Sequence, residues 1–347
     1  MSTPHRPPFT ITPRILGHVA ACCERVGSWR GGEGLALSPQ LRRENRIRSI
    51  QASLAIENNS LSIDQVTAIL EGRRVMGLPR EIQEVKNAIA CYDQLASFDT
   101  SSAPDFLKAH GLMMMALADD AGNFRRGGVG IYRGNQLIHM APPADRVPYL
   151  IDDLFAWFAS TDLHPLIASS ILHYEIEFIH PFSDGNGRMG RLWQSLALAR
   201  WHPELAYLPV ESVIRERQTA YYNALGASDR AAEATPFIEL ILDAITESLD
   251  SRTKSDPASD PASDPVSRLL ALFKSNESLS FQTMMERMQL RHRTYFRRTF
   301  LSPALAAKRL EMTLPETPRH PSQRYRLRVG VIKQGDHHII VQEDNES

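Results

Sequence analysis

The sequence of 347 residues predicts a mainly α-helical protein that carries one β-hairpin and ends in a small winged-helix-like domain. Apolar residues recur at helical spacing in segments such as 165–179. An alternating stretch at 124–140 contains a Gly-Asn turn signal, which is typical of a hairpin. Beyond residue 265, short helical segments precede strand-like alternation, the order expected of a winged helix.

The chain divides into four parts. We expect an N-terminal helical region at 1–95, which contains a helix at about 42–57, and then a helical core at 96–250. Residues 251–265 carry SDPASDPASDP, a run of small, acidic and proline residues that cannot bury a core and that reads as an exposed linker. The winged-helix-like domain is predicted at 266–347.

Within the core, residues 165–179 predict a buried helix and residues 188–201 predict a second one. Pro181 pushes the residue before it out of the helical region, so the first helix should end near His180. In the last domain, helices are predicted at 266–275, 279–288 and 292–301, and strands at 324–330 and 337–341.

Composition excludes several classes of protein. The net charge of −1 points to no particular partner, and three cysteines, two of them adjacent, give neither a disulfide framework nor a zinc-binding spacing. The sequence contains no apolar run long enough to span a membrane and no secretory leader. We therefore expect a cytoplasmic protein without a membrane partner.

One uninterrupted segment, HPFSDGNGRMGR at 180–191, concentrates the chemistry of the chain. A glycine-rich turn that leads into a helix leaves backbone N–H groups available for an anion. Arg188 and Arg191 share a helix face and can grip one polyphosphate. Asp184 is a carboxylate suited to Mg²⁺, and His180 can accept a proton near neutral pH. The segment therefore suits a nucleotide polyphosphate beside a general base.

This segment resembles the Fic motif, HPFx[DE]GNGRxxR, at every fixed position. Fic proteins are mostly helical enzymes that transfer AMP from ATP to a hydroxyl side chain of a target protein. The resemblance covers about residues 40–250 in the core and implies a protein adenylyltransferase. ATP would be the co-substrate, Mg²⁺ the metal, and a Ser, Thr or Tyr of a target protein the acceptor.

The resemblance implies a role for each motif position. His180 would be the base that deprotonates the target hydroxyl, and Asp184 would hold Mg²⁺. Arg191 would hold the terminal phosphate. The anion hole would be formed by Gly185, Asn186, Gly187 and Arg188.

An upstream segment, SLAIEN at 53–58, matches the Fic inhibition motif [ST]xxxE[GN]. Its position before the catalytic motif is that of the class II members of the family. The resemblance implies that Glu57, one helical turn after Ser53, pairs with Arg191 and so occupies the guanidinium meant for the γ-phosphate.

The hairpin at 124–140 resembles the flap that Fic enzymes place over the target segment, which then pairs with the flap main chain. The resemblance also implies contacts to the nucleotide, made by Val129, Gly130, Ile131 and Tyr132 of the flap and by Tyr222 and Asp229 further along.

Three other functions stay open at this stage. Glu57 could align a water that removes AMP from a modified protein, which would make the same site a hydrolase. Metal-dependent hydrolysis by His173, His180 and Asp184 is disfavoured by their spacing, and His173 fits a core histidine better.

The third function is DNA contact by the C-terminal domain. Residues 267–333 hold 14 Lys and Arg against 4 Asp and Glu, the local charge typical of a DNA-binding module. Within it, Arg291, Arg293, Arg297 and Arg298 alternate with Tyr295 and Phe296, although these aromatics could equally form a core. The family resemblance also makes a homodimer an expected state.

Overall fold

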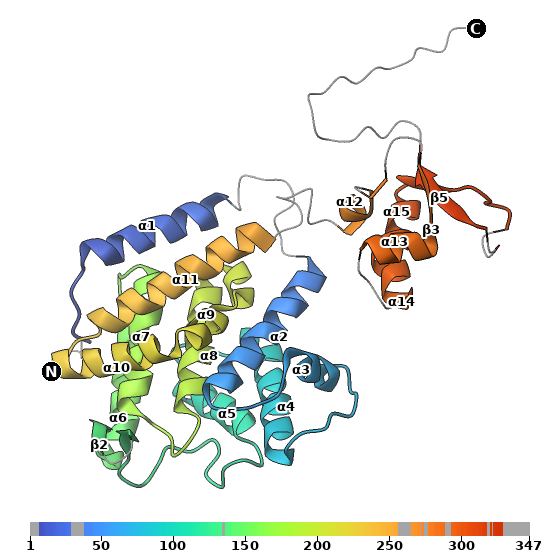
Figure 1. Cartoon of the computed structure of the whole chain (residues 1–347). Helices are drawn as coiled ribbons and strands as arrows, with labels where there is room; N and C mark the ends of the chain where they lie inside the picture. The colour runs from blue at the N-terminus through green and yellow to red at the C-terminus, as the bar shows by residue number, and fades with distance from the viewer. Residues whose placement is uncertain are drawn as a thin grey trace. The chain divides into compact units, whose positions relative to one another are not determined.

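The computed structural model describes residues 7–28, 38–133, 136–255, 265–270, 272–273, 277–288, 293–317, 320 and 322–328. The chain forms two compact units, residues 1–250 and 251–347 (Figure 1). The predicted fold class is confirmed, because the described residues are mostly helical and the strands form only a hairpin and a small sheet. None of the helices in the described ranges is long and apolar enough to cross a bilayer.

The first unit consists of helices around a central antiparallel pair. Its helices are α1 (Pro13–Ser28), α2 (Pro39–Ile56), α3 (Ile63–Leu70), α4 (Pro79–Asp93), α5 (Ala103–Met113), α6 (Val147–Ser160), α7 (Pro165–Ile179), α8 (Asn186–Trp201), α9 (Val210–Glu216), α10 (Gln218–Ala231) and α11 (Thr235–Ser255). The flap strands are β1 (Gly130–Arg133) and β2 (Gln136–Met140). Short 3₁₀ turns lie at Leu95–Ser97, Ala144–Arg146 and Pro203–Tyr207.

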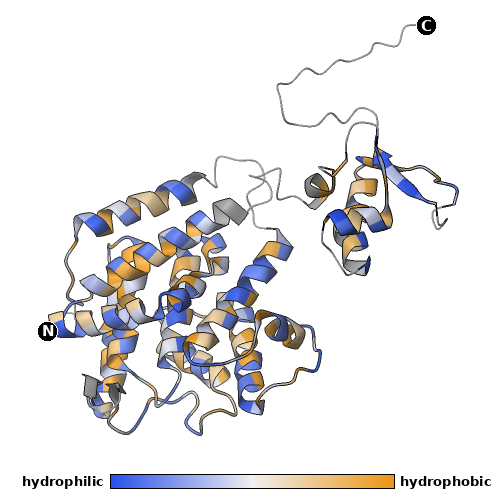
Figure 2. Ribbon diagram, in the orientation of Figure 1, coloured by the Kyte–Doolittle hydropathy of each residue, from blue (hydrophilic) through white to orange (hydrophobic). Residues whose placement is uncertain are grey.

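Helices α7 and α8 lie at the centre of the unit, and most residues of each helix are buried. Phe106 of α5 packs its ring against Phe182, 5.1 Å away, and against Trp193, 4.9 Å away. Hydrophobic residues gather in the interior of the unit (Figure 2). The segment at 180–185 therefore joins two helices that are largely buried.

Helix α2 is fastened to the unit at its C-terminal half. Arg215 donates a hydrogen bond to the Gln51 side chain at 2.8 Å, and Gln218 donates one to the Ile56 carbonyl at 2.8 Å. The helix ends there because Asn58 adopts a left-handed conformation with φ 68°, which asparagine tolerates better than most residues. The end of α2 is thus held against α9 and α10.

The second unit packs short helices on a three-stranded antiparallel sheet with strand order β3-β5-β4. Its elements are α12 (Pro265–Leu270), β3 (Ser278–Ser280), α13 (Phe281–Arg287), α14 (Arg293–Phe296), a π-helix (Arg297–Leu301), α15 (Ser302–Ala306), β4 (Leu310–Met312) and β5 (Arg324–Leu327). Their small core includes Phe273, Met284, Phe296, Leu310 and Tyr325.

Several boundaries differ from the sequence prediction. Residues 278–280 form a strand ahead of α13, because the Ser280 side chain accepts a hydrogen bond from Thr283 N–H and starts the helix only at Phe281. Strand β4 was not predicted, since three residues carry too little alternation. Helix α11 continues to Ser255, into the predicted linker. Residues 256–264 and the strand predicted at 337–341 lie outside the described ranges.

Candidate active site

The catalytic loop is a tight turn between α7 and α8. His180 ends α7 in a left-handed conformation with φ 50°, and Gly185 precedes α8 with φ 89°. The Asn186 side chain closes the turn on both sides of Phe182, accepting from its N–H and donating to its carbonyl at 2.9 Å each. The asparagine predicted for the anion hole therefore uses its side chain to shape the loop and has only its backbone N–H for an anion.

His180 is partly buried, and its ring is oriented by α7. The Nδ1 atom lies 3.3 Å from the Glu177 carbonyl oxygen. Because a carbonyl can only accept, this contact places the proton on Nδ1 in the neutral ring and leaves Nε2 as the proton acceptor. The arrangement is that of a general base whose tautomer is set by the preceding helical turn.

Asp184 has a half-exposed carboxylate, with 46% of its side chain accessible, at the mouth of the turn. Its Oδ1 accepts from Gly185 N–H at 2.6 Å and from Arg188 at 2.9 Å. Its Oδ2 accepts from Arg80 of α4 at 3.3 Å. The carboxylate is thus positioned and partly open to solvent, next to two guanidinium groups.

The N-terminus of α8 lacks a side-chain cap. Gly185 occupies the N-cap position and makes no side-chain capping bond, so the first N–H groups of the helix receive no side-chain cap. The Arg188 side chain is buried beside them, and its Nε has no hydrogen-bond partner among the described residues. A buried donor without a partner is costly, and a phosphate oxygen would satisfy it.

Arg191 is held by the end of α2. Its side chain is 1% exposed, and it donates to the Ser53 hydroxyl at 3.0 Å, to the Ser53 carbonyl at 3.1 Å and to Glu57 Oε1 at 2.8 Å. Burial acts to lower the pKa of Arg191, but the carboxylates of Glu57 and Glu177 outweigh it and raise the pKa above its usual value. Nε and Nη2 of the guanidinium are therefore engaged by the end of α2.

The flap pairs β1 with β2 from Gly130 opposite Met140, with an irregularity between Ile131 and Tyr132. Ala141 N–H donates to the Val129 carbonyl at 3.1 Å and extends the pairing by one step. Val129 and Gly130 are partly exposed, while the side chains of 131–133 and 136–139 lie outside the described part of the chain.

Tyr222 and Asp229, the predicted adenosine contacts, both lie on α10. Tyr222 is 39% exposed, and burial of the rest of its ring raises the pKa of its hydroxyl. Asp229 accepts a hydrogen bond from the Tyr174 hydroxyl at 3.0 Å, which anchors α10 to α7. Helix α10, which carries both residues, contacts the flap strand β2.

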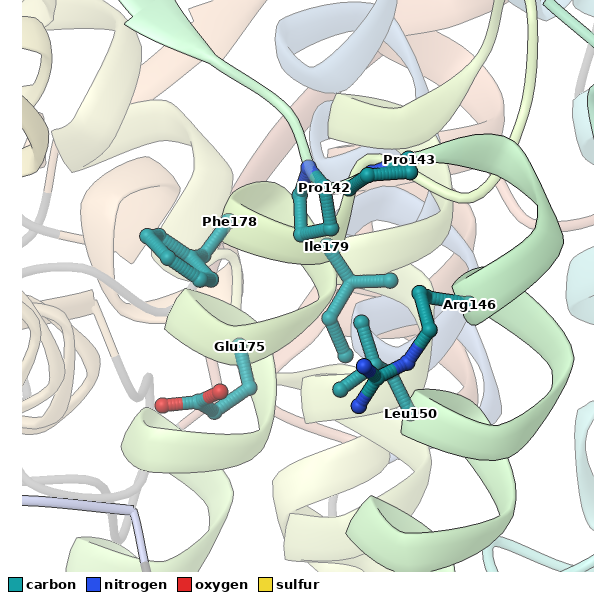
Figure 3. Close-up of a pocket in the computed structure, with 7 residues that line it drawn as sticks. All are labelled: Pro142, Pro143, Arg146, Leu150, Glu175, Phe178 and Ile179. Carbon is teal, nitrogen blue, oxygen red and sulfur yellow. The ribbon is translucent and has the colours of Figure 1, made fainter. Parts of the chain in front are cut away.

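A cavity of about 240 Å³ lies between the end of the flap, α6 and α7 (Figure 3). Its lining is mostly apolar and consists of Pro142, Pro143, Arg146, Leu150, Glu175, Phe178 and Ile179. Phe178 and Ile179 directly precede the catalytic histidine, so the cavity adjoins the loop from the α7 side.

Sequence reasoning missed residues that contact the loop from outside the motif, among them His110 and Arg80. His110 of α5 is fully buried and stacks on Phe182 with ring centroids 3.6 Å apart. Its Nδ1 accepts from Gly122 N–H at 2.9 Å, so its Nε2 donates to the Asp184 carbonyl at 3.0 Å. Arg80 reaches the Asp184 carboxylate from α4. Neither residue lies in a local pattern that could have indicated it.

His173, by contrast, is the core histidine that its sequence context favoured. It is fully buried, with Gln194 Oε1 2.7 Å from Nδ1 and the Tyr221 hydroxyl 3.1 Å from Nε2. Burial lowers the pKa of His173 to about 3, so it stays neutral. The described residues contain no group of three His, Cys, Asp or Glu side chains arranged to hold a metal.

Comparisons with known proteins place this geometry in a family. The Fic/DOC family model matches residues 100–198, and a model of the Fic-like C-terminal domain matches residues 264–328. A crystal structure of a Fic family protein from Desulfovibrio desulfuricans G20 is 51% identical with a TM-score of 0.72, covering 95% of this chain and all of that one. The chain belongs to the Fic family.

More distant Fic relatives share a smaller part. Proteins named protein adenylyltransferase Fic from Aedes aegypti and Drosophila erecta are each 28% identical, over 60% and 63% of this chain. The matches span only 42% and 44% of the lengths of those relatives. The Fic-1 structure from C. elegans, 23% identical with a TM-score of 0.59, covers 71% of this chain and 74% of that one and shares the fold.

The Fic loop of this chain fits a magnesium-bound nucleotide. Mg²⁺ is commonly held by one or two carboxylates together with phosphate oxygens, and Asp184 is one half-exposed carboxylate beside the open N-terminus of α8. The Nε of Arg188, on the same helical turn, is a buried donor without a hydrogen-bond partner among the described residues. Asp184 would thus hold the ion, and the helix end would hold the phosphates.

Proposed function

We propose that this chain is a protein adenylyltransferase that transfers AMP from ATP to a Ser, Thr or Tyr hydroxyl of a target protein. The observation that carries the proposal is the loop itself, in which an oriented imidazole, a half-exposed carboxylate and an uncapped helix N-terminus converge on one turn. The names of the relatives from Aedes aegypti and Drosophila erecta support the same reaction.

In this reaction His180 Nε2 takes the proton of the target hydroxyl, and the oxygen of that hydroxyl attacks the α-phosphorus of ATP. The bond from that phosphorus to the bridging oxygen breaks, and pyrophosphate leaves with the electron pair. Mg²⁺, when bound, supplies charge neutralisation at the phosphates. The backbone N–H groups of the α8 N-terminus and Arg188 hold the phosphates, while flap pairing presents the target hydroxyl.

We further propose that the enzyme is restrained by Glu57. The Glu57 carboxylate accepts a hydrogen bond from the Arg191 guanidinium at 2.8 Å, and Ser53 accepts two more from the same guanidinium. A γ-phosphate would have to displace this carboxylate or bind elsewhere, where the α-phosphorus is not aligned for attack. Solvent only partly screens the attraction between Glu57 and Arg191, since the Arg191 side chain is buried and that of Glu57 is 35% exposed.

The decisive experiment compares wild type, Glu57→Gly and Glu57→Gly/His180→Ala, incubated with Mg²⁺ and ATP and analysed by intact mass. We expect added AMP on Glu57→Gly alone, because Arg191 is released and His180 is needed to deprotonate the acceptor. The double variant should still bind ATP in a calorimetric titration. Equal AMP incorporation by both variants would remove His180 from the role of base, and absence of any product despite ATP binding would contradict the transfer reaction.

Removal of AMP by the same site is the second candidate. The Glu57 carboxylate lies next to the Arg191 end of the phosphate site, where it could orient a water. Incubation of AMP-modified Glu57→Gly protein with unmodified wild type separates the two directions. Loss of the modification that depends on Glu57 would favour hydrolysis.

DNA contact by the C-terminal unit and a homodimer are further proposals. Arg293 and Arg297 stand over the Phe281 ring at 4.9 and 5.5 Å, both exposed, whereas Phe296 is part of the core. Arg291 and the side chains of Tyr295 and Arg298 lie outside the described part. DNA binding by the full chain that weakens steeply with salt would support DNA contact. A mass in solution above the 39.0 kDa of one chain would support the homodimer.

A further inference from the structure

Arg125 lies between α5 and β1, and its guanidinium is buried, with 4% of the residue exposed. It donates to the His180 carbonyl at 2.6 Å, to the Gly127 carbonyl at 2.8 Å, and to the carbonyls of Pro142 at 2.6 Å and Ile179 at 3.3 Å. Every one of these acceptors is a backbone oxygen. Through these bonds Arg125 holds the main chain in place and does not pair with a charged side chain.

The end of α7 compensates the buried charge. Burial lowers the pKa of Arg125, but a guanidinium remains protonated at any physiological pH. The carbonyls of Ile179 and His180 belong to the last turn of α7, where the helix dipole concentrates negative charge. A cation at this place is stabilised and also caps carbonyls that would otherwise lack donors.

The same guanidinium joins the catalytic histidine to both ends of the flap. Gly127 precedes β1 and Pro142 follows β2, so the two remaining acceptors are the points where the hairpin leaves and rejoins the unit. His180 itself adopts a left-handed conformation just beyond the helix, where the helical hydrogen-bond pattern no longer supports its carbonyl. The planar guanidinium of Arg125 thus connects His180, the proposed base, to the flap. The flap is the element expected to hold the target segment that carries the acceptor hydroxyl.

We propose that Arg125 is a positioning residue that fixes the flap, and with it the target hydroxyl, relative to the His180 imidazole. This inference rests on the proposed transferase function. A lysine cannot replace it fully, because a single ammonium lacks the planar fork that reaches four carbonyls in fixed directions. Loss of the fork leaves the phosphate-binding turn at 184–188 in place, since none of its four acceptors belongs to that turn.

The test uses the full chain in the Glu57→Gly background, with Arg125→Met, Arg125→Lys and the matched control Arg126→Met, whose arginine is exposed. Self-modification is followed over time by intact mass, and ATP binding by calorimetry. We expect Arg125→Met to slow transfer by about 100-fold, the effect of a misplacement near 1 Å, with ATP affinity nearly unchanged. Arg125→Lys should fall between, and Arg126→Met should match the parent.

Hydrogen exchange measured by mass spectrometry gives a readout independent of activity. Arg125→Met should speed exchange of the peptide that covers 127–142 and leave α2 unchanged. Transfer at the control rate, a parallel loss of ATP affinity, or unchanged exchange at the flap would each overturn the proposal. If no Glu57→Gly variant transfers AMP, the transferase assignment fails, and the exchange pattern still decides whether Arg125 fixes the flap.

Discussion

At the residue scale, the motif depends on side chains that lie far from it in sequence. The Asp184 carbonyl is held by His110, the Asp184 carboxylate by Arg80, and the His180 carbonyl by Arg125. A catalytic loop rich in glycine has little intrinsic rigidity, so these outer contacts set the geometry of its functional atoms. Their effect should therefore appear in how the site binds metal and aligns substrate.

The two ring nitrogens of His110 can be tested separately. In the Glu57→Gly background, His110→Gln can keep a donor to the Asp184 carbonyl, whereas His110→Asn can keep only the acceptor for Gly122 N–H. We expect His110→Asn to raise the Mg²⁺ concentration for half-maximal transfer by about tenfold, as losses of outer contacts to metal sites do. His110→Gln should stay close to the parent, and identical Mg²⁺ curves for the two variants would contradict this role.

The residues within the motif could be predicted from the sequence, but these supporting residues could not. His180, Asp184, Arg188 and Arg191 occupy one contiguous segment, so their proximity follows from chain connectivity. Arg80 lies 104 residues before Asp184 in the sequence, and His110 lies 74 residues before it. Each belongs to a helix with other polar residues, and no sequence pattern marks it out. Only the packing of α4 and α5 against the loop gives them a role.

At the element scale, the close approach of α7 and α8 determines how the site is supported. A side chain at Gly190 would place its Cβ 2.6 Å from His173 Cδ2. His173 cannot move aside, because Gln194 and Tyr221 hold its two nitrogens and its surroundings are fully buried. The glycine is therefore required for these two helices to pack, independently of any function in the loop.

Gly190→Ala should lower the free energy of unfolding by about 1–3 kcal/mol, the usual cost of overpacking a core. Gly17→Ala is the matched control, since Gly17 also lies in a helix but no atom would lie within 4 Å of the new Cβ. It should be neutral or stabilising by up to about 1 kcal/mol through helix propensity. Urea unfolding of the full chain measures both, and equal midpoints would show that α7 and α8 can separate without cost.

Elements were predicted well where they are long and periodic, and poorly where they are short. Helices α7 and α8 match the apolar pattern because each is buried over several turns. Strands β3 and β4 contain three residues each, which is too few to show alternation, and they are stabilised by pairing with β5 and by burial of Leu279 and Leu310. The continuation of α11 to Ser255 was also missed, because the proline repeat dominated that region.

At the scale of the whole molecule, buried histidines make the first unit sensitive to acid. Burial lowers the pKa of His173 to about 3, and it also lowers the pKa values of His110 and His164. Below about pH 6.5 the unfolded chain binds protons at these positions that the folded chain does not, so stability falls as the pH decreases. Glu211 acts in the opposite sense, because burial raises its pKa.

His173→Gln should therefore flatten the pH dependence of stability. Between about pH 6 and pH 4.5 the wild type should lose about 1.4 kcal/mol per pH unit more than the variant, the value for one proton. The measurement is urea unfolding across this range. A variant that is uniformly less stable but has an unchanged slope would mean that His173 is protonated in the folded state.

Helix α11 has a practical consequence for protein engineering. Near its start, Phe237 packs its ring 5.0 Å from that of His173, and its 21 residues then carry the chain about 30 Å away, at 1.5 Å per residue. Helix α1 is bonded along it, through Thr12 to Glu239 and through Arg25 to Asp250. Fusion partners, labels or replacement domains are therefore best attached after Ser255, because the length of α11 separates this point from the catalytic loop. Trimming residues 7–28 would remove α1, the helix that supports α11.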